Sequence, residues 1–108
     1  MDLLKKHCMP CEGGIPPLTD EEEDNYKKEV ASWNLLRGDS HKLRKEFVFN
    51  NFKEAMGFVN LVAEIAEQEN HHPDIYIFYN KVNIELYTHA VNGLSESDFI
   101  MAAKIDVI

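Results

Sequence analysis

The chain has 108 residues and a net charge of −8 at pH 7, and 44% of its residues are hydrophobic. These values predict one domain with one core. They also argue against a nucleic-acid-binding surface, which needs a basic patch to displace phosphate counterions. No apolar run approaches the ~20 residues of a membrane-spanning helix, and the start of the chain lacks the apolar core of a secretory signal. Its two cysteines then point to a reducing, cytoplasmic compartment.

An irregular N-terminal arm is expected over residues 1–18, ahead of a single domain at residues 19–108, because proline and glycine crowd the arm. Cys8 and Cys11 have the spacing of half a zinc site, with His7 beside them. The second half is missing, since neither another Cys-x-x-Cys nor a His-x-x-x-His follows. A surface arm with two free thiols is therefore favoured over metal or redox chemistry.

A first helix is predicted from Asp20 to about Ala31. Thr19 and Glu22 have the spacing of a capping box, in which each side chain binds the backbone N–H of the other residue. Acidic residues crowd the first turn, where the helix dipole favours negative charge. This acidic run is interpreted as a solvated face.

A hairpin is predicted next, with strands over residues 33–38 and 42–50 and a turn that begins at Gly38. Apolar and polar side chains alternate along the second strand. One face of that strand carries Leu43, Phe47 and Phe49. The alternation indicates a half-buried antiparallel strand.

The main core helix is expected to begin after Asn51, which can cap it, and to end at Asn70. Its apolar residues recur at helical spacing: Phe52, Ala55, Met56, Phe58, Val59, Leu61, Val62, Ala63, Ile65 and Ala66. At its end, Pro73 lacks an N–H and disfavours the helical conformation at His72. The adjacent His71 and His72 are thus placed where a helix ends.

A second hairpin is predicted from strands over residues 74–79 and 82–89, joined by a turn at Asn80-Lys81. In this register His89 ends a strand, off the core-facing side. Strand ends are where connecting loops place functional groups.

Ser95 and Asp98 have the spacing of another capping box and are expected to open a last helix. The predicted fold is α+β, in the order α-β-β-α-β-β-α, with one four-stranded antiparallel sheet and three helices. An open sheet of four strands leaves edges, so pairing with another copy of the chain is expected.

His71, His72 and His89 allow three interpretations. Three histidines suffice for a catalytic zinc ion, but adjacent histidines rarely both bind and the helical i, i+4 spacing is absent. A structural role at a helix end explains one histidine better than three. The third interpretation is metal-free proton transfer, in which imidazoles flanked by Glu67 and Asp74 act as acid, base and orienting group.

Three segments also carry a family resemblance: Glu67-x-x-Asn-His-His-Pro-Asp74, Tyr79-Asn-Lys-Val-x-Ile-x-Leu-x-Thr-His89 and Gly93-Leu-Ser-x-x-Asp98. Trp33 and the aromatic pattern from Phe47 to Phe58 belong to the same resemblance. Over residues 19–107 the chain closely resembles the pterin-4a-carbinolamine dehydratases, and its arm looks like the leader of bacterial-type members. This resemblance implies a four-stranded antiparallel sheet with three helices on one face.

The resemblance implies a lyase that removes water from 4a-hydroxytetrahydropterin to give quinonoid dihydropterin, which recycles pterin for aromatic amino acid hydroxylases. No metal or organic cofactor is implied. The catalytic residues would be His71, His72, His89 and Glu67. His71 and His89 are assigned as acid and base, in either order, and His72 as the group that orients the pterin. Glu67 would fix a histidine tautomer.

The resemblance further assigns the substrate-binding residues, which would be His71, His72, Pro73, Thr88, His89, Ala90, Val91 and Asp98. Asp98 has a second interpretation as the N3 residue of a capping box. Animal members differ at Asp74-Ile75 and at Ala90-Val91, which leaves the histidines intact and would change the rim of the pocket.

A protein-interaction module is the alternative function, since animal relatives also act as a dimerisation cofactor for a homeodomain transcription factor. The complete histidine set and the bacterial-like leader favour the enzyme. The expected partners are a small-molecule pterin and further copies of the chain, as a dimer or tetramer. Neither direct nucleic-acid contact nor a membrane is expected.

Overall fold

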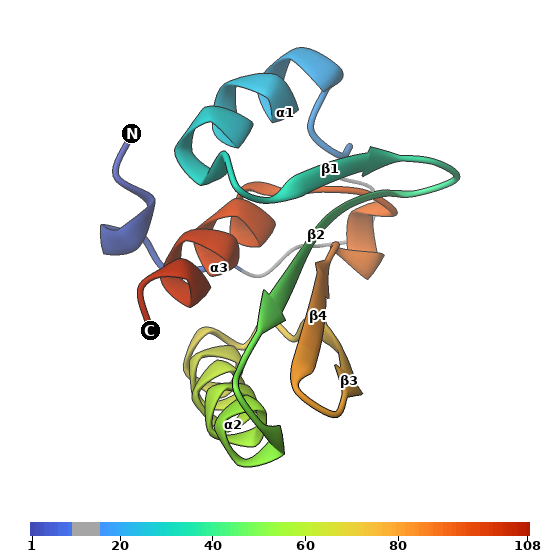
Figure 1. The fold of residues 1–108 in the computed structure, drawn as a ribbon. Coiled ribbons are helices and arrows are strands. Elements are labelled where there is room, and N and C mark those ends of the chain that lie inside the picture. The colour runs from blue at the N-terminus through green and yellow to red at the C-terminus, as the bar shows by residue number, and fades with distance from the viewer. Residues whose placement is uncertain (10–15) are drawn as a thin grey trace.

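The computed structural model describes residues 1–9 and 16–108 (Figure 1). Its main elements are α1 Asp20–Lys27, β1 Asn34–Arg37, β2 His41–Val48, α2 Phe52–Glu69, β3 Asp74–Phe78, β4 Lys81–Leu86 and α3 Glu96–Asp106. Short 3-10 helices add η1 Leu3–Lys5, η2 Lys28–Val30 and η3 His89–Val91. The predicted α+β class and order of elements are confirmed.

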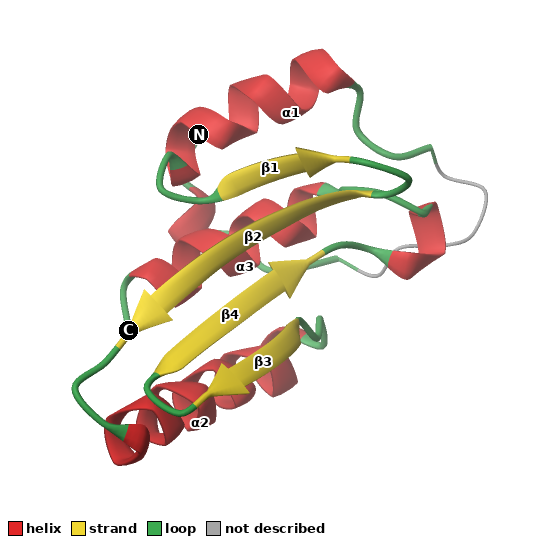
Figure 2. Cartoon of the chain, turned by 45° about the vertical axis from the view of Figure 1, so that its right-hand side comes forward, coloured by secondary structure: helices red, strands yellow, loops and turns green. Residues whose placement is uncertain are grey.

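The two hairpins join into one antiparallel sheet in the order β1-β2-β4-β3. They meet where β2 pairs with β4, from Leu43 opposite Leu86 to Val48 opposite Lys81. Helices α2 and α3 lie behind one face of this sheet, and α1 runs beside β1 (Figure 2). Strands β1 and β3 are therefore the edges.

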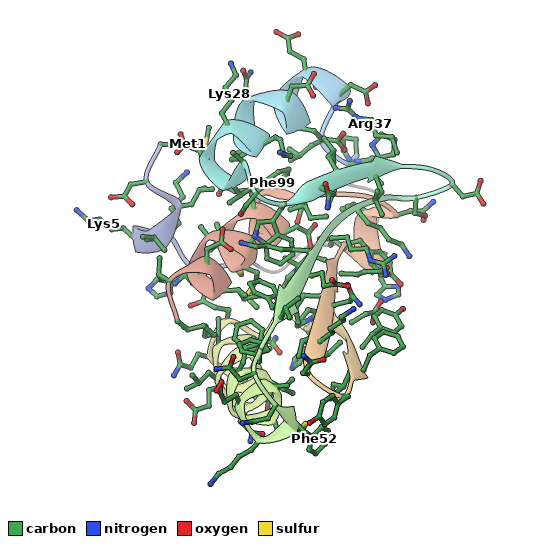
Figure 3. The ribbon with its side chains drawn as sticks, viewed as in Figure 1. Met1, Lys5, Lys28, Arg37, Phe52 and Phe99 are labelled. Carbon is green, nitrogen blue, oxygen red and sulfur yellow. The ribbon has the colours of Figure 1, made fainter. Side chains whose placement is uncertain are left out.

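The core fills the space between the sheet and the two helices behind it. Successive strand side chains point to opposite faces, so β2 and β4 send alternate residues into the core. The fully buried strand residues are Leu43, Val82, Ile84 and Leu86. Tyr26 of α1 stacks on Phe99 of α3 with 5.1 Å between ring centroids. Figure 3 shows Phe99 in the interior, whereas Lys5 and Lys28 point outward.

The predicted caps are present at the first two helices. Thr19 and Glu22 form the capping box of α1, and the Asn51 side chain accepts from the Glu54 N–H at 2.9 Å. The apolar stripe of α2 is narrower than predicted, since Phe52 and Leu61 are 49% and 46% exposed. The buried residues of α2 are Ala55, Phe58, Val62 and Ala66. Leu61 lies outside this stripe, and Phe52 belongs to the first turn, where the helix extends beyond the core.

Strand β4 is shorter than predicted, and the expectation that His89 ends a strand is wrong. β4 ends at Leu86, which is opposite Leu43 near the start of β2. Thr88 pairs instead with Gly93 in an isolated antiparallel bridge. This bridge turns the chain back on itself, so His89 becomes the first residue of η3.

The turn of the second hairpin also differs by one residue from its prediction. Lys81 already pairs with Phe78, so Tyr79 and Asn80 form the turn. Tyr79 has a φ of 52°, a conformation that side-chain-bearing residues seldom adopt. Local sequence therefore favoured the wrong pair of residues.

The N-terminal arm is not irregular throughout, because Leu3–Lys5 forms η1. Leu3 is 3% exposed and joins the core, and Cys8 packs against it. The predicted thiol of Cys11 lies outside the described residues. In the part of the chain that is described, no helix combines the length and apolar character needed to cross a membrane.

Candidate active site

One hollow brings together the three histidines that the sequence analysis selected. Its volume is about 270 Å³. It is lined by Met9, Asn70, His71, His72, Tyr87, Thr88, His89 and Ala90. These residues come from the arm, from the end of α2 and from the segment after β4. Segments that are distant in the sequence therefore form one site.

The end of α2 places the two adjacent histidines. Asn70 adopts the left-handed conformation with a φ of 51°, which ends the helix. The Ala66 carbonyl accepts from the backbone N–H of Asn70, and also from that of His71 at 3.2 Å. The chain then leaves the helix axis and enters β3 one residue after Pro73. His71 and His72 are thus held at a capped helix end, as predicted.

The segment after β4 places His89. The bridge between Thr88 and Gly93 closes a short loop, with the Thr88 N–H donating to the Gly93 carbonyl at 2.8 Å. The Tyr87 ring lies 4.3 Å from the His89 imidazole, measured between centroids, and packs against it. Within residues 1–9 and 16–108, the structure records no hydrogen bond to the His89 ring. None of the described residues therefore bonds to either ring nitrogen of His89, and the residue is exposed.

Asp98 links this loop to His71. Its side chain is fully buried. One carboxylate oxygen, Oδ2, accepts from the Thr88 hydroxyl at 2.7 Å and from the Ser95 N–H at 2.9 Å. The other, Oδ1, lies 2.7 Å from Nε2 of His71. An ionised carboxylate can only accept, so His71 carries a proton on Nε2 and leaves Nδ1 for other chemistry.

Glu67 pairs with His72 rather than with His71. The Glu67 carboxylate lies 2.5 Å from Nε2 of His72. Both side chains are exposed, at 77% and 57%. The carboxylate can select the tautomer of His72, but solvent weakens the pair. Among the three histidines of the hollow, His71 is the one whose carboxylate partner, Asp98, is buried.

The predicted lining residues do not all face the hollow. His71, His72, Thr88, His89 and Ala90 line it, whereas Pro73, Val91 and Asp98 do not. Val91 is the last residue of η3 and is only 7% exposed. Asp98 is likewise buried, on the far side of His71. The lining residues that sequence reasoning missed are Met9, Asn70 and Tyr87.

Comparison with known proteins places the chain in a family. A family model described as pterin 4 alpha carbinolamine dehydratase matches residues 16–108. A relative from Nitrosospira multiformis is 50% identical over 99% of this chain and 92% of its own length. One from Rubrobacter xylanophilus is 47% identical over 97% of this chain and 96% of its own length. Both bear the name "Putative pterin-4-alpha-carbinolamine dehydratase".

This chain belongs to the pterin 4 alpha carbinolamine dehydratase family. As a member of that family it is a hydro-lyase, as the resemblance implied. A solved structure described as a transcriptional coactivator/pterin dehydratase from Brucella melitensis superimposes with a TM-score of 0.78 and 33% identity. That match covers 83% of this chain and 95% of the other.

A second solved structure of the dehydratase fold has a different described role. It is a pterin dehydratase-like protein identified as a RuBisCO assembly factor in the alpha-carboxysome. It matches with a TM-score of 0.60 and 28% identity, over 69% of this chain and 86% of its own. Solved structures with this fold are thus described both as a pterin dehydratase and as an assembly factor.

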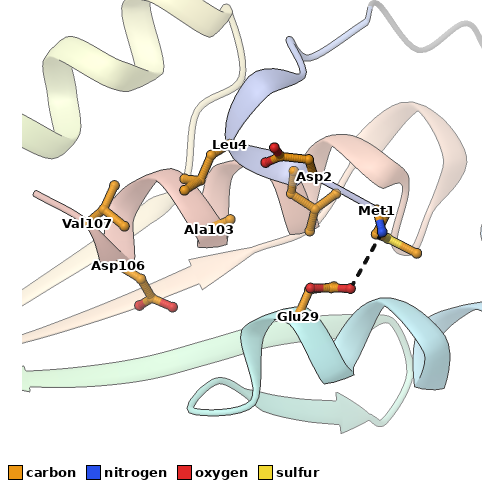
Figure 4. A pocket seen from close by; sticks show the side chains of 8 residues that line it. Met1, Asp2, Leu4, Glu29, Ala103, Asp106 and Val107 are labelled. Carbon is orange, nitrogen blue, oxygen red and sulfur yellow. Dashed lines mark ion pairs between the residues drawn. The ribbon is translucent and has the colours of Figure 1, made fainter.

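The chain has another hollow at its N-terminus, and Figure 4 shows it between η1, η2 and the end of α3. Its volume is about 210 Å³. The Met1 amino group and the Glu29 carboxylate form an ion pair of 3.9 Å across it. No histidine lines it. The hollow with the three histidines is therefore the candidate active site.

A possible metal-binding group lies elsewhere in the structure. Among the described residues, Asp20, Glu23 and His41 form a group whose ligand atoms lie within 4.8 Å of one another. Arg37 already donates to the buried Glu23 at 3.0 Å. The guanidinium of Arg37 therefore supplies the positive charge that a metal ion would bring to this group.

Burial raises the pKa of the Cys8 thiol to about 11, which keeps it protonated and unreactive at neutral pH.

Glu69 is an acidic group whose lowered pKa has a clear consequence for the pH dependence of stability. Burial alone would raise its pKa, but hydrogen bonds from the Cys8 N–H, His7 and Lys104 outweigh burial and lower the pKa to about 2. The unfolded chain, with an ordinary pKa of 4.5, takes up the proton first as the pH falls. Glu69 therefore stabilises the fold above pH 4.5, and this contribution is lost as the pH falls towards 2.

We expect Glu69→Gln to lower the melting temperature by several degrees at neutral pH, because the variant loses charge-assisted hydrogen bonds. The difference from the wild type should shrink as the pH is lowered from 4.5 towards 2. Thermal melts followed by circular dichroism at each pH would measure it. A difference that stays constant down to the lowest pH would contradict this account.

Proposed function

We propose that the protein dehydrates 4a-hydroxytetrahydropterin to quinonoid dihydropterin by histidine acid/base catalysis, without a metal. The observation that carries the proposal is the convergence of His71, His72 and His89 on one hollow. Histidine is the side chain best suited to give and take protons near neutral pH. The net charge of −8 suits a small, weakly charged substrate better than a polyanion.

The reaction needs two proton transfers. A base takes the proton from pterin N5, the C4a–O bond breaks, and the electron pair of N5 forms the new N5–C4a double bond. An acid gives a proton to the departing hydroxyl, which leaves as water. A positioned acid or base contributes on the order of 10²–10⁴ to such a rate.

We assign His71 and His89 as this acid–base pair, and His72 as the residue that orients the pterin. Asp98 holds Nε2 of His71, so Nδ1 is the nitrogen available for transfer. The His89 ring has its orientation set by Tyr87, and none of the described residues bonds to either of its nitrogens. Thr88 and Ala90 would contact the substrate, and Glu67 would select the His72 tautomer.

Recycling of pterin for aromatic amino acid hydroxylases would be the physiological role, in the cytoplasm. Self-association forms part of the same proposal, because β3 is an edge strand and exposes Ile77 and Phe78. A second copy added at that edge would cover both side chains. Sedimentation of the protein as a monomer would contradict this part.

The test of the proposal is a stopped-flow assay on freshly generated 4a-hydroxytetrahydropterin, with quinonoid product detected by absorbance. The protein should speed dehydration well above its spontaneous rate, and heat-denatured protein should not. A rate equal to that in buffer alone would reject the proposal. It would favour the interaction-module alternative, which the described role of the carboxysomal relative makes the next candidate.

A further inference from the structure

We propose that the N-terminal segment His7–Met9 forms a wall of the substrate site, with Glu69 as the residue that positions it. The proposal rests on the proposed pterin chemistry and adds a contact that the histidines do not supply. Met9 lines the hollow together with His71, His72 and His89. Of the arm residues that the structure describes, Met9 is the one that lines the hollow.

Glu69 attaches the arm to the end of α2. Its carboxylate accepts from the Cys8 N–H at 2.8 Å, from His7 Nδ1 at 3.1 Å and from the Lys104 ammonium at 3.1 Å. The Glu69 side chain is only 6% exposed, so these bonds form away from bulk water. Glu69 is two residues before His71, and the attachment therefore fixes the arm relative to the first histidine.

Two further bonds attach the arm to the first turn of α3. The Cys8 thiol donates to the Ser97 carbonyl at 3.5 Å, and the Ser97 hydroxyl donates to the Met9 carbonyl at 3.4 Å. Ser97 is next to Asp98, the carboxylate that holds His71. The backbone of Met9 is thus tied to the same turn that orients the candidate acid or base.

The chain is also held where it approaches α1. The Leu18 N–H donates to the Leu94 carbonyl at 2.9 Å. Pro17 packs closely on Gly93. A Cβ added to Gly93 would lie 2.9 Å from the Cβ of Pro17. Gly93 belongs to the bridge that closes the His89 loop. The described arm residues 7–9 and 17–18 therefore contact both segments that carry histidines.

The chemistry of Met9 indicates its role. A thioether has no proton to exchange near neutral pH, and its side chain is 72% exposed although it borders a site made largely of polar groups. An exposed, flexible and polarisable side chain packs well on the face of a flat aromatic ring. Met9 should therefore contribute to binding of a two-ring heterocycle and not to the proton transfers.

The first experiment separates binding from chemistry. Met9→Ala should raise KM for 4a-hydroxytetrahydropterin about three- to tenfold with kcat within twofold of the wild type. Met9→Leu should restore most of the loss, and Glu69→Gln should raise KM through displacement of the arm. Lys5→Ala is the matched control, because Lys5 lies on the same arm but its ion pair of 3.7 Å is with Asp2 of that arm, outside the hollow. An unchanged KM in Met9→Ala would overturn the inference.

The second experiment needs no turnover and uses the wild-type protein. Oxidised biopterin should slow the oxidation of Met9 by dilute peroxide, measured by peptide mass spectrometry. Met1, which is 59% exposed and borders the other hollow, should oxidise at the same rate with and without biopterin. Equal Met9 rates under both conditions would overturn the inference. Absent turnover with protected Met9 would instead reject the proposed reaction and keep the binding site.

Discussion

Replacement of His89 by alanine is expected to slow the dehydration by more than a hundredfold without a loss of stability. The imidazole is exposed and lacks a hydrogen-bond partner among the described residues, so its removal breaks no buried interaction. A missing general acid or base costs on the order of 10²–10⁴ in rate. Stopped-flow rates and melting curves of the same preparation would measure both quantities.

Replacement of His71 by alanine should give a similar loss of rate but a lower melting temperature. The change leaves the buried Asp98 carboxylate without one of its donors, and an unsatisfied buried acceptor costs about 1–3 kcal/mol. For the other position, His89→Gln is the control for His89→Ala, because glutamine keeps a side chain that can hydrogen-bond but cannot act as an acid or base. Turnover close to wild type in both alanine variants would rule out the acid–base assignment.

Local sequence signals predicted the elements of this fold well. The capping residues Thr19 and Asn51 mark their helices because a cap depends on neighbours three residues away. The end of β4 could not be found in the same way. The alternation that ends at His89 continues past Leu86, but the sheet stops there because the pairing with β2 stops.

The histidines of the site and Glu67, the partner of His72, could be found from sequence, but the contact between His71 and Asp98 could not. His71 and His72 lie at a helix end that Asn70 and Pro73 predict from the sequence. The residue that holds His71 is 27 positions away, at Asp98. Spacing gives no sign of such a contact, and the capping-box pattern around Asp98 offered a sufficient local explanation for it.

The contact of the arm with the candidate site could not be predicted from the sequence for the same reason. Cys8 and Glu69 are 61 positions apart, and tertiary packing brings them together. Proline and glycine in the arm indicated irregular backbone, which says nothing about where the arm docks. Contacts of this range follow from tertiary packing, and a single sequence does not encode them as a pattern.

Asp98→Asn is expected to lower both activity and stability, because the two carboxylate oxygens serve different partners. Oδ2 holds Thr88 and the start of α3, and Oδ1 holds His71. An amide keeps one acceptor oxygen and presents an NH₂ group in place of the other. If the oxygen keeps the cap, the NH₂ group faces Nε2 of His71 and forces its proton to Nδ1.

A histidine held in the wrong tautomer cannot use Nδ1 as a base. The same carboxylate-to-amide change behind the imidazole of serine proteases costs up to ~10⁴ in rate. We therefore expect kcat to fall at least tenfold and its pH profile to change, with a stability loss of about 1–3 kcal/mol. Stopped-flow kinetics across pH and thermal melts would measure the two effects.

Thr19→Ala is the matched control, since it removes a helix cap far from the histidines and should cost about 1 kcal/mol with kcat unchanged. A lower melting temperature with full activity in Asp98→Asn would make Asp98 a cap alone. Lost activity at unchanged stability would make it a positioning residue alone. The expected loss of both follows from one buried carboxylate that joins the start of α3, the Thr88 loop and His71, so that the helix cap and the imidazole tautomer depend on the same charge.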